Sequence, residues 1–149
     1  MIWAGFSAFG TTSIAVVPPK TKSAGYQRIL LSNLLPYIRR FPSVKFVFQQ
    51  NNASIHASKS TKAWLLSQKL DVMKWPSRSP DLNPIENLWG ILVRDVYADC
   101  RQYNTVDELK CAILKAWSRI GPEVLKKLID SMQNRIFSTI QVSGGCTKY

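Results

Sequence analysis

Two polar segments of this 149-residue chain carry the side chains best suited to chemistry. The first reads FQQNNASIH from Phe48 to His56, and the second reads PDLNPIENLWG from Pro80 to Gly90. Their imidazole, amide and carboxylate groups are of the types that act in acid–base catalysis or bind metal ions. The first segment follows a predicted strand and the second opens a predicted helix. Because sites in α/β proteins gather at strand ends, both segments are candidate sites.

The same residues also have structural roles open to them. Asn51 and Asn52 suit a turn, because asparagine tolerates left-handed backbone and makes local hydrogen bonds. Glu86 lies one turn after Asn83, a predicted helix N-cap, so it could serve only as a capping-box partner. A single histidine such as His56 is more often a hydrogen-bonded structural residue than a catalytic one. Considered without other information, the two segments favour these structural roles.

The hydrophobic pattern predicts strands and helices that alternate around these segments. Two short strands form a hairpin over 1–17, with its turn at 10–12. The elements that follow are a helix over 26–41, a buried strand over 44–48, a polar loop over 51–58, a helix over 60–70 and a strand over 72–75. Three further helices begin at Pro84 behind its N-cap, at the capping box of Thr105, and at Pro122. This order predicts an α/β fold with a mixed sheet flanked by helices.

Apolar residues at helical spacing define the expected buried faces of these helices. In the helix over 60–70 they are Trp64, Leu65 and Leu66. In the last helix they are Leu125, Leu128, Ile129, Met132 and Ile136.

The two polar segments, extended to Trp75–Gly90, resemble the core of the mariner-superfamily (Tc/mariner) DDE transposases. The consensus motif of that family is QQDNAPxH for the first segment and SPDLNPIENxW for the second. The final residues 144–149 are also similar to the family's C-terminus. The resemblance implies an RNase H-like catalytic domain in which three carboxylates hold two divalent metal ions, Mg²⁺ or Mn²⁺. In the family these ions activate water for strand nicking and then a DNA 3′-OH for joining.

Carried over one by one, the motif residues leave this site short of carboxylates. Glu86 matches the family's third carboxylate, and His56, Asp81, Asn83 and Pro84 match residues of its structural motif. Position 51 is Asn where the family has its second Asp, although the spacing to Glu86 is the family's own. The first Asp belongs on a strand before Met1, so we expect an RNase H-like fold that lacks its first, central strand.

The missing strand and missing acids set three expectations. We expect a truncated catalytic domain over 1–142 and a loose tail over 143–149. Because the missing strand would leave the hairpin apart from the strands at 44–48 and 72–75, we expect open strand edges and a marginally stable monomer. We also expect no metal-dependent cleavage, since two neighbouring dications need anionic ligands.

Charge is distributed very unevenly along the chain. Residues 1–70 carry nine Lys and Arg and no acid, and the net charge of the whole chain is +11. A one-sided positive charge favours a polyanionic partner such as DNA, although a merely solvated surface is the alternative. The candidate phosphate-binding residues are Lys20, Lys22, Arg28, Arg39, Arg40 and Arg78. Trp75, near Arg78, could touch DNA or pack in the core.

These observations lead to one main interpretation and two alternatives. The main one is a transposase-derived, catalytically inactive protein with weak, nonspecific DNA binding. The first alternative is a fragment of a transposase that catalyses metal-dependent strand cleavage and DNA integration. The second is a non-enzymatic interaction module that uses residues 105–140 to bind intact transposase subunits or chromatin; those helices could instead complete the core. Self-association is a further expected partnership.

Cysteine content and hydropathy bear on the compartment. The three cysteines form no C-x-x-C pair, and one His leaves no zinc-finger ligand set, so a reducing compartment is expected. No apolar run reaches the length of a membrane span, and the apolar start lacks the basic region of a signal peptide. We therefore expect a nuclear or cytoplasmic protein that is neither secreted nor membrane-bound.

Overall fold

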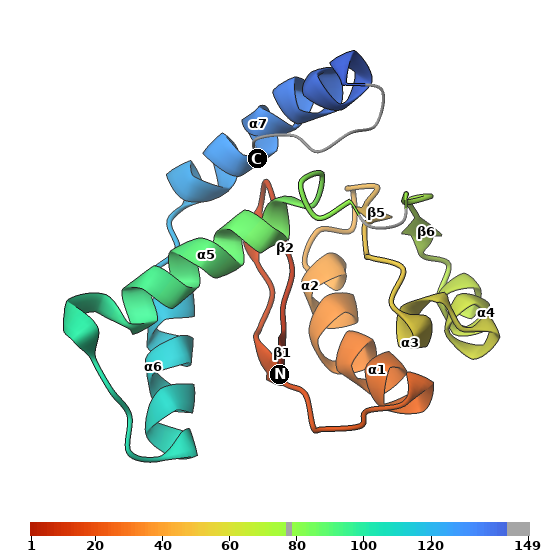
Figure 1. Ribbon diagram of the computed structural model, residues 1–149. Coiled ribbons are helices and arrows are strands. Elements are labelled where there is room, and N and C mark those ends of the chain that lie inside the picture. Colours follow the sequence, from red (N-terminus) through yellow and green to blue (C-terminus); the bar gives the residue numbers. More distant parts are fainter. Residues whose placement is uncertain (77–78, 143–149) are drawn as a thin grey trace. The chain divides into compact units, whose positions relative to one another are not determined.

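The computed structural model describes residues 1–76 and 79–142, which form two compact units. The first unit comprises Met1–Gly5 and Thr11–Arg78, and the second comprises Phe6–Gly10 and Ser79–Tyr149. Figure 1 shows the helices and strands of each unit. The predicted tail over 143–149 lies outside the described residues. Among the residues that are described, no helix is both long and apolar enough to cross a membrane.

The chain begins with the antiparallel hairpin that the sequence predicts. Strand β1 (Ile2–Trp3) pairs with β4 (Ala15–Val16), and β2 (Phe6–Ser7) pairs with β3 (Gly10–Thr11). The turn lies at residues 8 and 9 instead of 10–12. Gly10 follows it with φ of +119°, a backbone conformation that a residue with a side chain rarely adopts.

A helical segment follows the hairpin and begins three residues before the predicted start at 26. It consists of α1 (Ser23–Ile29), the π-helical turn η1 (Leu30–Leu34) and α2 (Leu35–Arg39). Pro36 cannot donate a backbone hydrogen bond into this ladder, and the Asn33 side chain donates to the Ile29 carbonyl at 2.8 Å. Interruptions of this kind are a known cause of π-helical turns, which accounts for η1.

The strand that leads into the first polar segment pairs with a parallel strand that follows the segment. Strand β5 (Val47–Phe48) pairs with β6 (Asp71–Val72), with Val47 opposite Asp71 and Phe48 opposite Val72. The prediction of a buried strand over 44–48 is wrong, because only two of its residues form a strand and Val47 is 47% exposed. Among the described residues β6 is the one strand that pairs with β5, so one edge of β5 has no strand beside it.

The described strands form three separate two-stranded sheets, β1–β4, β2–β3 and β5–β6. The hairpin sheet and the β5–β6 pair are therefore not joined by strand pairing, as expected for a sheet without its central strand. Helix α4 (Lys59–Ser67) connects β5 to β6, and a short helix, α3 (Ser54–Ala57), precedes it. The predicted polar loop over 51–58 is thus wrong at its end, since α3 lies within it.

The core of the first unit forms where α1, η1 and α4 meet. Its fully buried side chains are Tyr26, Leu30, Leu34 and Leu65, and Trp3, Ile38, Phe48, Ile55, Trp64, Leu70 and Val72 pack around them. Burying one such leucine stabilises the folded state by roughly 1.5–3 kcal/mol. Leu66 was expected on the same face but is 78% exposed, because the helix turns it away from its buried neighbour Leu65.

The second unit is built mainly from three helices that begin where the sequence predicts. They are α5 (Pro84–Val96), α6 (Val106–Ser118) and α7 (Pro122–Gln141), with the 3₁₀ turn η2 (Ala98–Cys100) after α5. Their buried apolar side chains are Leu88, Leu92, Val96, Ala116, Trp117, Leu125 and Leu128. The rings of Trp89 and Trp117 stack with centroids 5.6 Å apart, so α6 packs against α5.

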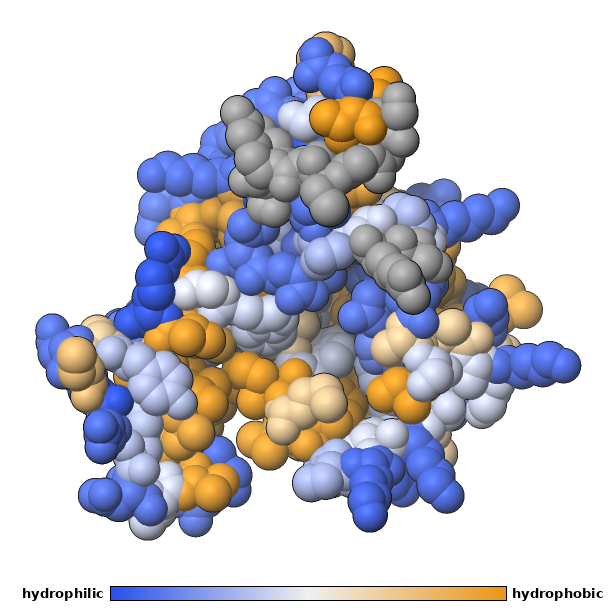
Figure 2. All heavy atoms as spheres, in the orientation of Figure 1, coloured by the Kyte–Doolittle hydropathy of each residue, from blue (hydrophilic) through white to orange (hydrophobic). Residues whose placement is uncertain are grey.

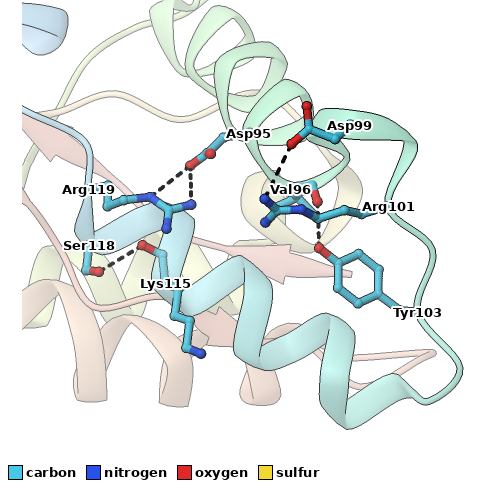
Figure 3. A network of polar contacts seen from close by, with 8 residues as sticks. All are labelled: Asp95, Val96, Asp99, Arg101, Tyr103, Lys115, Ser118 and Arg119. Atoms are coloured by element: carbon cyan, nitrogen blue, oxygen red, sulfur yellow. Dashed lines mark hydrogen bonds and ion pairs between the residues drawn. The ribbon is translucent and has the colours of Figure 1, made fainter.

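A polar network reinforces the packing of α6 on the end of α5 (Figure 3). Arg119, at the end of α6, donates from Nη2 to Oδ2 of Asp95 at 2.8 Å. The Tyr103 hydroxyl donates to the Val96 carbonyl at 2.5 Å and so satisfies one backbone oxygen at the end of α5. These contacts hold the connection between α5 and α6 in place.

The outer face of α7 differs from the prediction. Ile136 was expected in its buried stripe but is 50% exposed, whereas its neighbour Arg135 is only 2% exposed. The buried positions Leu125, Leu128 and Arg135 follow one stripe at helical spacing, and Ile136 lies one step around the helix from it. Figure 2 shows that apolar side chains lie at the surface of the molecule among hydrophilic ones.

Candidate functional site

The first polar segment forms a hydrogen-bonded cluster at the carboxyl end of β5. Oδ1 of Asn51 accepts the backbone N–H of Ala53 at 3.2 Å and lies 2.7 Å from Nδ1 of His56. The same Nδ1 lies 3.3 Å from the Asn51 carbonyl oxygen. Because both of these oxygens are acceptors, Nδ1 is assigned as the protonated nitrogen of His56. The Asn51 side-chain oxygen is therefore already occupied by two donors.

Aromatic packing holds this cluster against the core. The His56 ring stacks on the Tyr26 ring with centroids 4.1 Å apart, and the Tyr26 hydroxyl donates to Oε1 of Gln50 at 2.6 Å. Burial lowers the pKa of His56, although its hydrogen bond to the Asn51 backbone opposes the shift. Burial also raises the pKa of Tyr26, against the effect of a hydrogen bond with Trp3. At neutral pH these side chains are all uncharged.

A hydrogen bond connects the loops that follow β5 and β6. Nδ2 of Asn52 donates to the Trp75 carbonyl at 2.8 Å. The backbone N–H of Met73 also donates to the Phe48 carbonyl at 2.9 Å, which extends the parallel pairing beyond the two strands. Trp75 is half-buried, which fits both of the roles that the sequence allows for it, DNA contact and core packing.

The second polar segment places Glu86 in the first turn of α5. Asn83 is the N-cap residue, as predicted, but its side chain makes no capping hydrogen bond to the helix backbone. Instead, Nδ2 of Asn83 donates to Oε1 of Glu86 at 3.3 Å. The expected capping role of Asn83 is therefore wrong, because its amide holds the Glu86 carboxylate. Pro84 at the first helical position needs no acceptor, which favours the helix start there.

Residues on both sides of Glu86 are bound by one arginine of α7. Nη1 of Arg135 donates to the Asp81 carbonyl at 2.8 Å and to Oδ1 of Asn87 at 2.7 Å. The sequence analysis did not find this residue. A signal was present, since Arg135 is a charged residue that continues the apolar stripe of Leu125 and Leu128.

Neither polar segment by itself has the ligands for a pair of divalent metal ions. Such a site needs several oxygen ligands with net negative charge. In the first unit, Asn51 supplies a neutral amide whose oxygen is already hydrogen-bonded, and in the second unit Glu86 supplies one carboxylate. Among the described residues no group of three His, Cys, Asp or Glu side chains could hold a metal ion.

Three of the predicted phosphate-binding residues line one groove of the first unit. The groove has a volume of about 660 Å³ and lies between the Pro18–Pro19 turn and the outer face of α1 and η1. Lys20, Lys22 and Arg28 line it and are all exposed. No ion pair found among the described residues involves any of these three. We call this surface the basic groove.

The other predicted phosphate-binding residues lie elsewhere. Arg39 and Arg40 are exposed at the end of α2, at the far end of the helical segment from the groove. The Arg40 guanidinium lies 5.5 Å from the centroid of the Phe41 ring and 5.9 Å from that of Tyr37. This contact orients the Arg40 side chain along an aromatic surface. Arg78 lies outside the described residues.

Comparison with known proteins gives consistent matches over the whole chain. The sequence model of the family described as "DDE superfamily endonuclease" matches residues 5–110. The Tc3 transposase of Caenorhabditis elegans is 44% identical over 149 residues, which are 100% of this chain and 45% of that protein. The Tcb2 transposase of Caenorhabditis briggsae is 34% identical over the same 149 residues, which are 54% of its length.

Solved structures match the fold of the chain. The catalytic domain of Mos1 mariner transposase has a TM-score of 0.86 at 17% identity, and the match covers 99% of this chain and 75% of that domain. The Mos1 mariner paired end complex with Mn gives the same TM-score at 16% identity and covers 99% of this chain and 44% of the Mos1 chain. The predicted α/β, RNase H-like fold class is thereby confirmed, and divalent metal ions occur in this family.

Proposed function

Because the chain belongs to the Tc/mariner family of DDE transposases, we propose that it is a transposase-derived protein with an incomplete catalytic site. In this proposal it binds DNA weakly and without sequence preference, and it neither cuts nor joins DNA. The observation that carries the proposal is Asn51, a neutral amide at the position where the family motif has an acid. The structure supports this role by engaging the amide oxygen with Ala53 and His56.

The loss of charge at position 51 supports the inactive part of this proposal. A carboxylate about 4 Å from a unit charge gains about 4 kcal/mol at an effective dielectric constant near 20, and a divalent ion doubles that attraction. A neutral amide oxygen keeps only a dipole interaction. Glu86 is exposed and held at one oxygen by Asn83, so by itself it offers a monodentate or bidentate ligand to one ion. Two close dications would repel each other without further anions.

DNA is the partner that the charge distribution supports. Lys20, Lys22 and Arg28 place three unpaired cations along one groove, within a stretch of 70 residues that holds no acid. A surface of this kind binds phosphates through Coulomb attraction and counterion release, which carry no sequence information. The relatives are transposases, and Mos1 forms a paired end complex, which supports DNA as the partner here as well. With DNA as its partner, a nuclear location is part of the proposal.

A nicking assay tests the catalytic part of the proposal. The 149-residue protein is incubated with supercoiled plasmid in Mg²⁺ or Mn²⁺, and relaxed and linear products are measured against a Glu86→Ala control. We expect equal, background-level nicking by both proteins. Nicking by the wild-type chain that Glu86→Ala abolishes would overturn the proposal. Binding of a labelled duplex, measured by fluorescence anisotropy on the same preparations, tests the DNA-binding part separately.

The second candidate function is that of a segment of an active transposase. The observation that favours it is the match along the entire chain to a transposase of which the chain spans 45%. In that case Glu86 would act with carboxylates supplied by other parts of a longer polypeptide. A polypeptide extended to the full length of its relatives would then cleave transposon ends, and its activity would increase after Asn51→Asp. Cleavage by the extended protein but not by the 149-residue chain would favour this candidate.

A further inference from the structure

Arg135 is a charged side chain buried in the interior of the second unit. It lies on α7 and is 2% exposed. Taking a guanidinium out of water is costly unless its N–H groups are hydrogen-bonded. Arg135 continues the buried stripe formed by Leu125 and Leu128 on α7. A leucine at this position would therefore suit the packing of the helix. The retention of an arginine there indicates that its hydrogen bonds have a specific use.

The hydrogen bonds of Arg135 reach across the chain to the segment around Glu86. Nη1 donates to the Asp81 carbonyl at 2.8 Å and to Oδ1 of Asn87 at 2.7 Å, while Nε donates to Oγ of Ser131 at 2.8 Å. Ser131 lies on the preceding turn of α7 and itself donates to the Leu128 carbonyl at 2.6 Å. The guanidinium is thus fixed to its own helix at one edge and to both flanks of Glu86 at the other.

The start of α5 depends on support from outside the helix. The Asn83 side chain makes no capping bond, and Pro84 cannot donate a backbone hydrogen bond. Asp81 lies in the loop before the helix, and Asn87 lies in the turn that carries Glu86. Two bonds from one nitrogen therefore fix the backbone before the N-cap and the side chain directly after Glu86. These two constraints hold the turn from which the Glu86 side chain leaves the helix, and the Asn83 amide then binds its carboxylate.

We infer that Arg135 is a positioning residue for Glu86, acting from α7 through Asp81 and Asn87. The family match ends at residue 110, so the support for the DDE motif residue comes from a helix beyond the matched segment. This role goes beyond the proposed function, because it holds whether or not the chain cleaves DNA. It also assigns Asn87, beside Glu86 in the second polar segment, a role as the acceptor for Arg135. A lysine cannot replace the arginine, since one ammonium group lacks the planar set of N–H donors.

Side-chain NMR together with hydrogen exchange tests the inference on the full chain. The variants are Arg135→Lys, Arg135→Met and Asn87→Ala, and the matched control is Lys126→Met, which removes an exposed cation from the same helix. We expect Arg135→Lys and Asn87→Ala to shift the Glu86 carboxyl carbon and the Asn83 side-chain amide signals. We also expect amide exchange at 85–88 to rise at least tenfold relative to α6. Lys126→Met should change none of these signals.

Two results would overturn the inference. One is an unchanged Glu86 carboxyl signal in Arg135→Lys, and the other is an equal rise in exchange over α5, α6 and α7, which a purely structural role would give. If Arg135→Met does not fold, Arg135→Lys and Asn87→Ala still decide the matter. The double variant Arg135→Lys with Asn87→Ala should shift Glu86 no further than Arg135→Lys alone, because Arg135→Lys already removes the contact that Asn87→Ala removes. Additive shifts would contradict the inference.

Discussion

Oδ1 of Asn51 lies 2.7 Å from Nδ1 of His56, at the position where the family motif places a carboxylate. The two residues are held together by the turn that leads into α3, in which the N–H groups of His56 and Ala57 donate to the Ala53 carbonyl. His56 stacks on Tyr26, so the pair is anchored to the core of the first unit. The loop at the position of the family's second acid is thus ordered around a neutral amide.

Replacing Asn51 with Asp should raise the pKa of His56. A carboxylate at hydrogen-bonding distance from Nδ1 stabilises the imidazolium form, whereas the present amide does not. The pKa is measured by following the His56 Cε1–H signal in an NMR titration of both proteins. Asn51→Ser is the control, since it removes the amide without adding charge. An unchanged pKa in Asn51→Asp would mean that the two side chains do not meet in solution.

The stability of the first unit should fall on acidification because of His56. Burial lowers the pKa of His56 in the folded state, so the unfolded chain binds more protons than the folded chain below the ordinary pKa of about 6.5. The His56 contribution is therefore complete above that pH and is lost as the pH falls toward the folded pKa. Urea unfolding at a series of pH values from 7.5 to 5 measures it. His56→Gln should show a shallower decline, and equal slopes in both proteins would contradict the assignment.

The sequence predicted helices better than strands in this chain, and the reason is local chemistry. Helix α5 begins at Pro84 and α6 begins after the Thr105 cap, both of which act within one turn. Strand β5 is different, because a run such as Val44–Phe48 becomes a buried strand only if neighbours cover it. With β6 as its partner, Val47 remains 47% exposed.

The candidate site was predicted in part for a similar reason. The resemblance to the family motif identified Glu86, Asn51 and His56. The contact of Asn51 with His56 follows from their closeness in sequence. Tyr26 and Arg135 were missed as members of the site. Tyr26 reaches Gln50 across 24 positions and Arg135 reaches Asp81 across 54, and a local sequence pattern does not identify such distant partners.

The capping box at the start of α6 allows a stability prediction for the second unit. Oγ1 of Thr105 accepts the Glu108 N–H at 3.1 Å, and Oε2 of Glu108 accepts the Asn104 N–H at 2.9 Å. Thr105→Ala should lower the free energy of unfolding by about 1 kcal/mol, because helix N–H groups lose their acceptor. Thr105→Ser keeps the hydroxyl and should cost much less. Denaturant unfolding compares the two, and equal losses would show that the methyl group, and not the cap, is responsible.

The basic groove provides the test of DNA binding by a defined surface. Lys20, Lys22 and Arg28 are exposed and line one groove, so their combined replacement by alanine should weaken binding to any duplex alike. The slope of log K against log salt should become shallower by about one for each cation that contacts a phosphate, and by about three in the triple variant. Fluorescence anisotropy from 50 to 200 mM salt measures the slope on two unrelated duplexes.

The control for this experiment is a variant that removes the same charge from the other unit. Lys110, Lys126 and Arg119 are also on the surface, but each already forms an ion pair with an aspartate. Their replacement by alanine should leave the salt dependence nearly unchanged, because a paired cation releases little counterion when DNA binds. Equal effects of the two triple variants on the slope would show that DNA binding depends on the net charge of the protein alone. A difference of two or more in slope would locate the phosphate contacts in the groove.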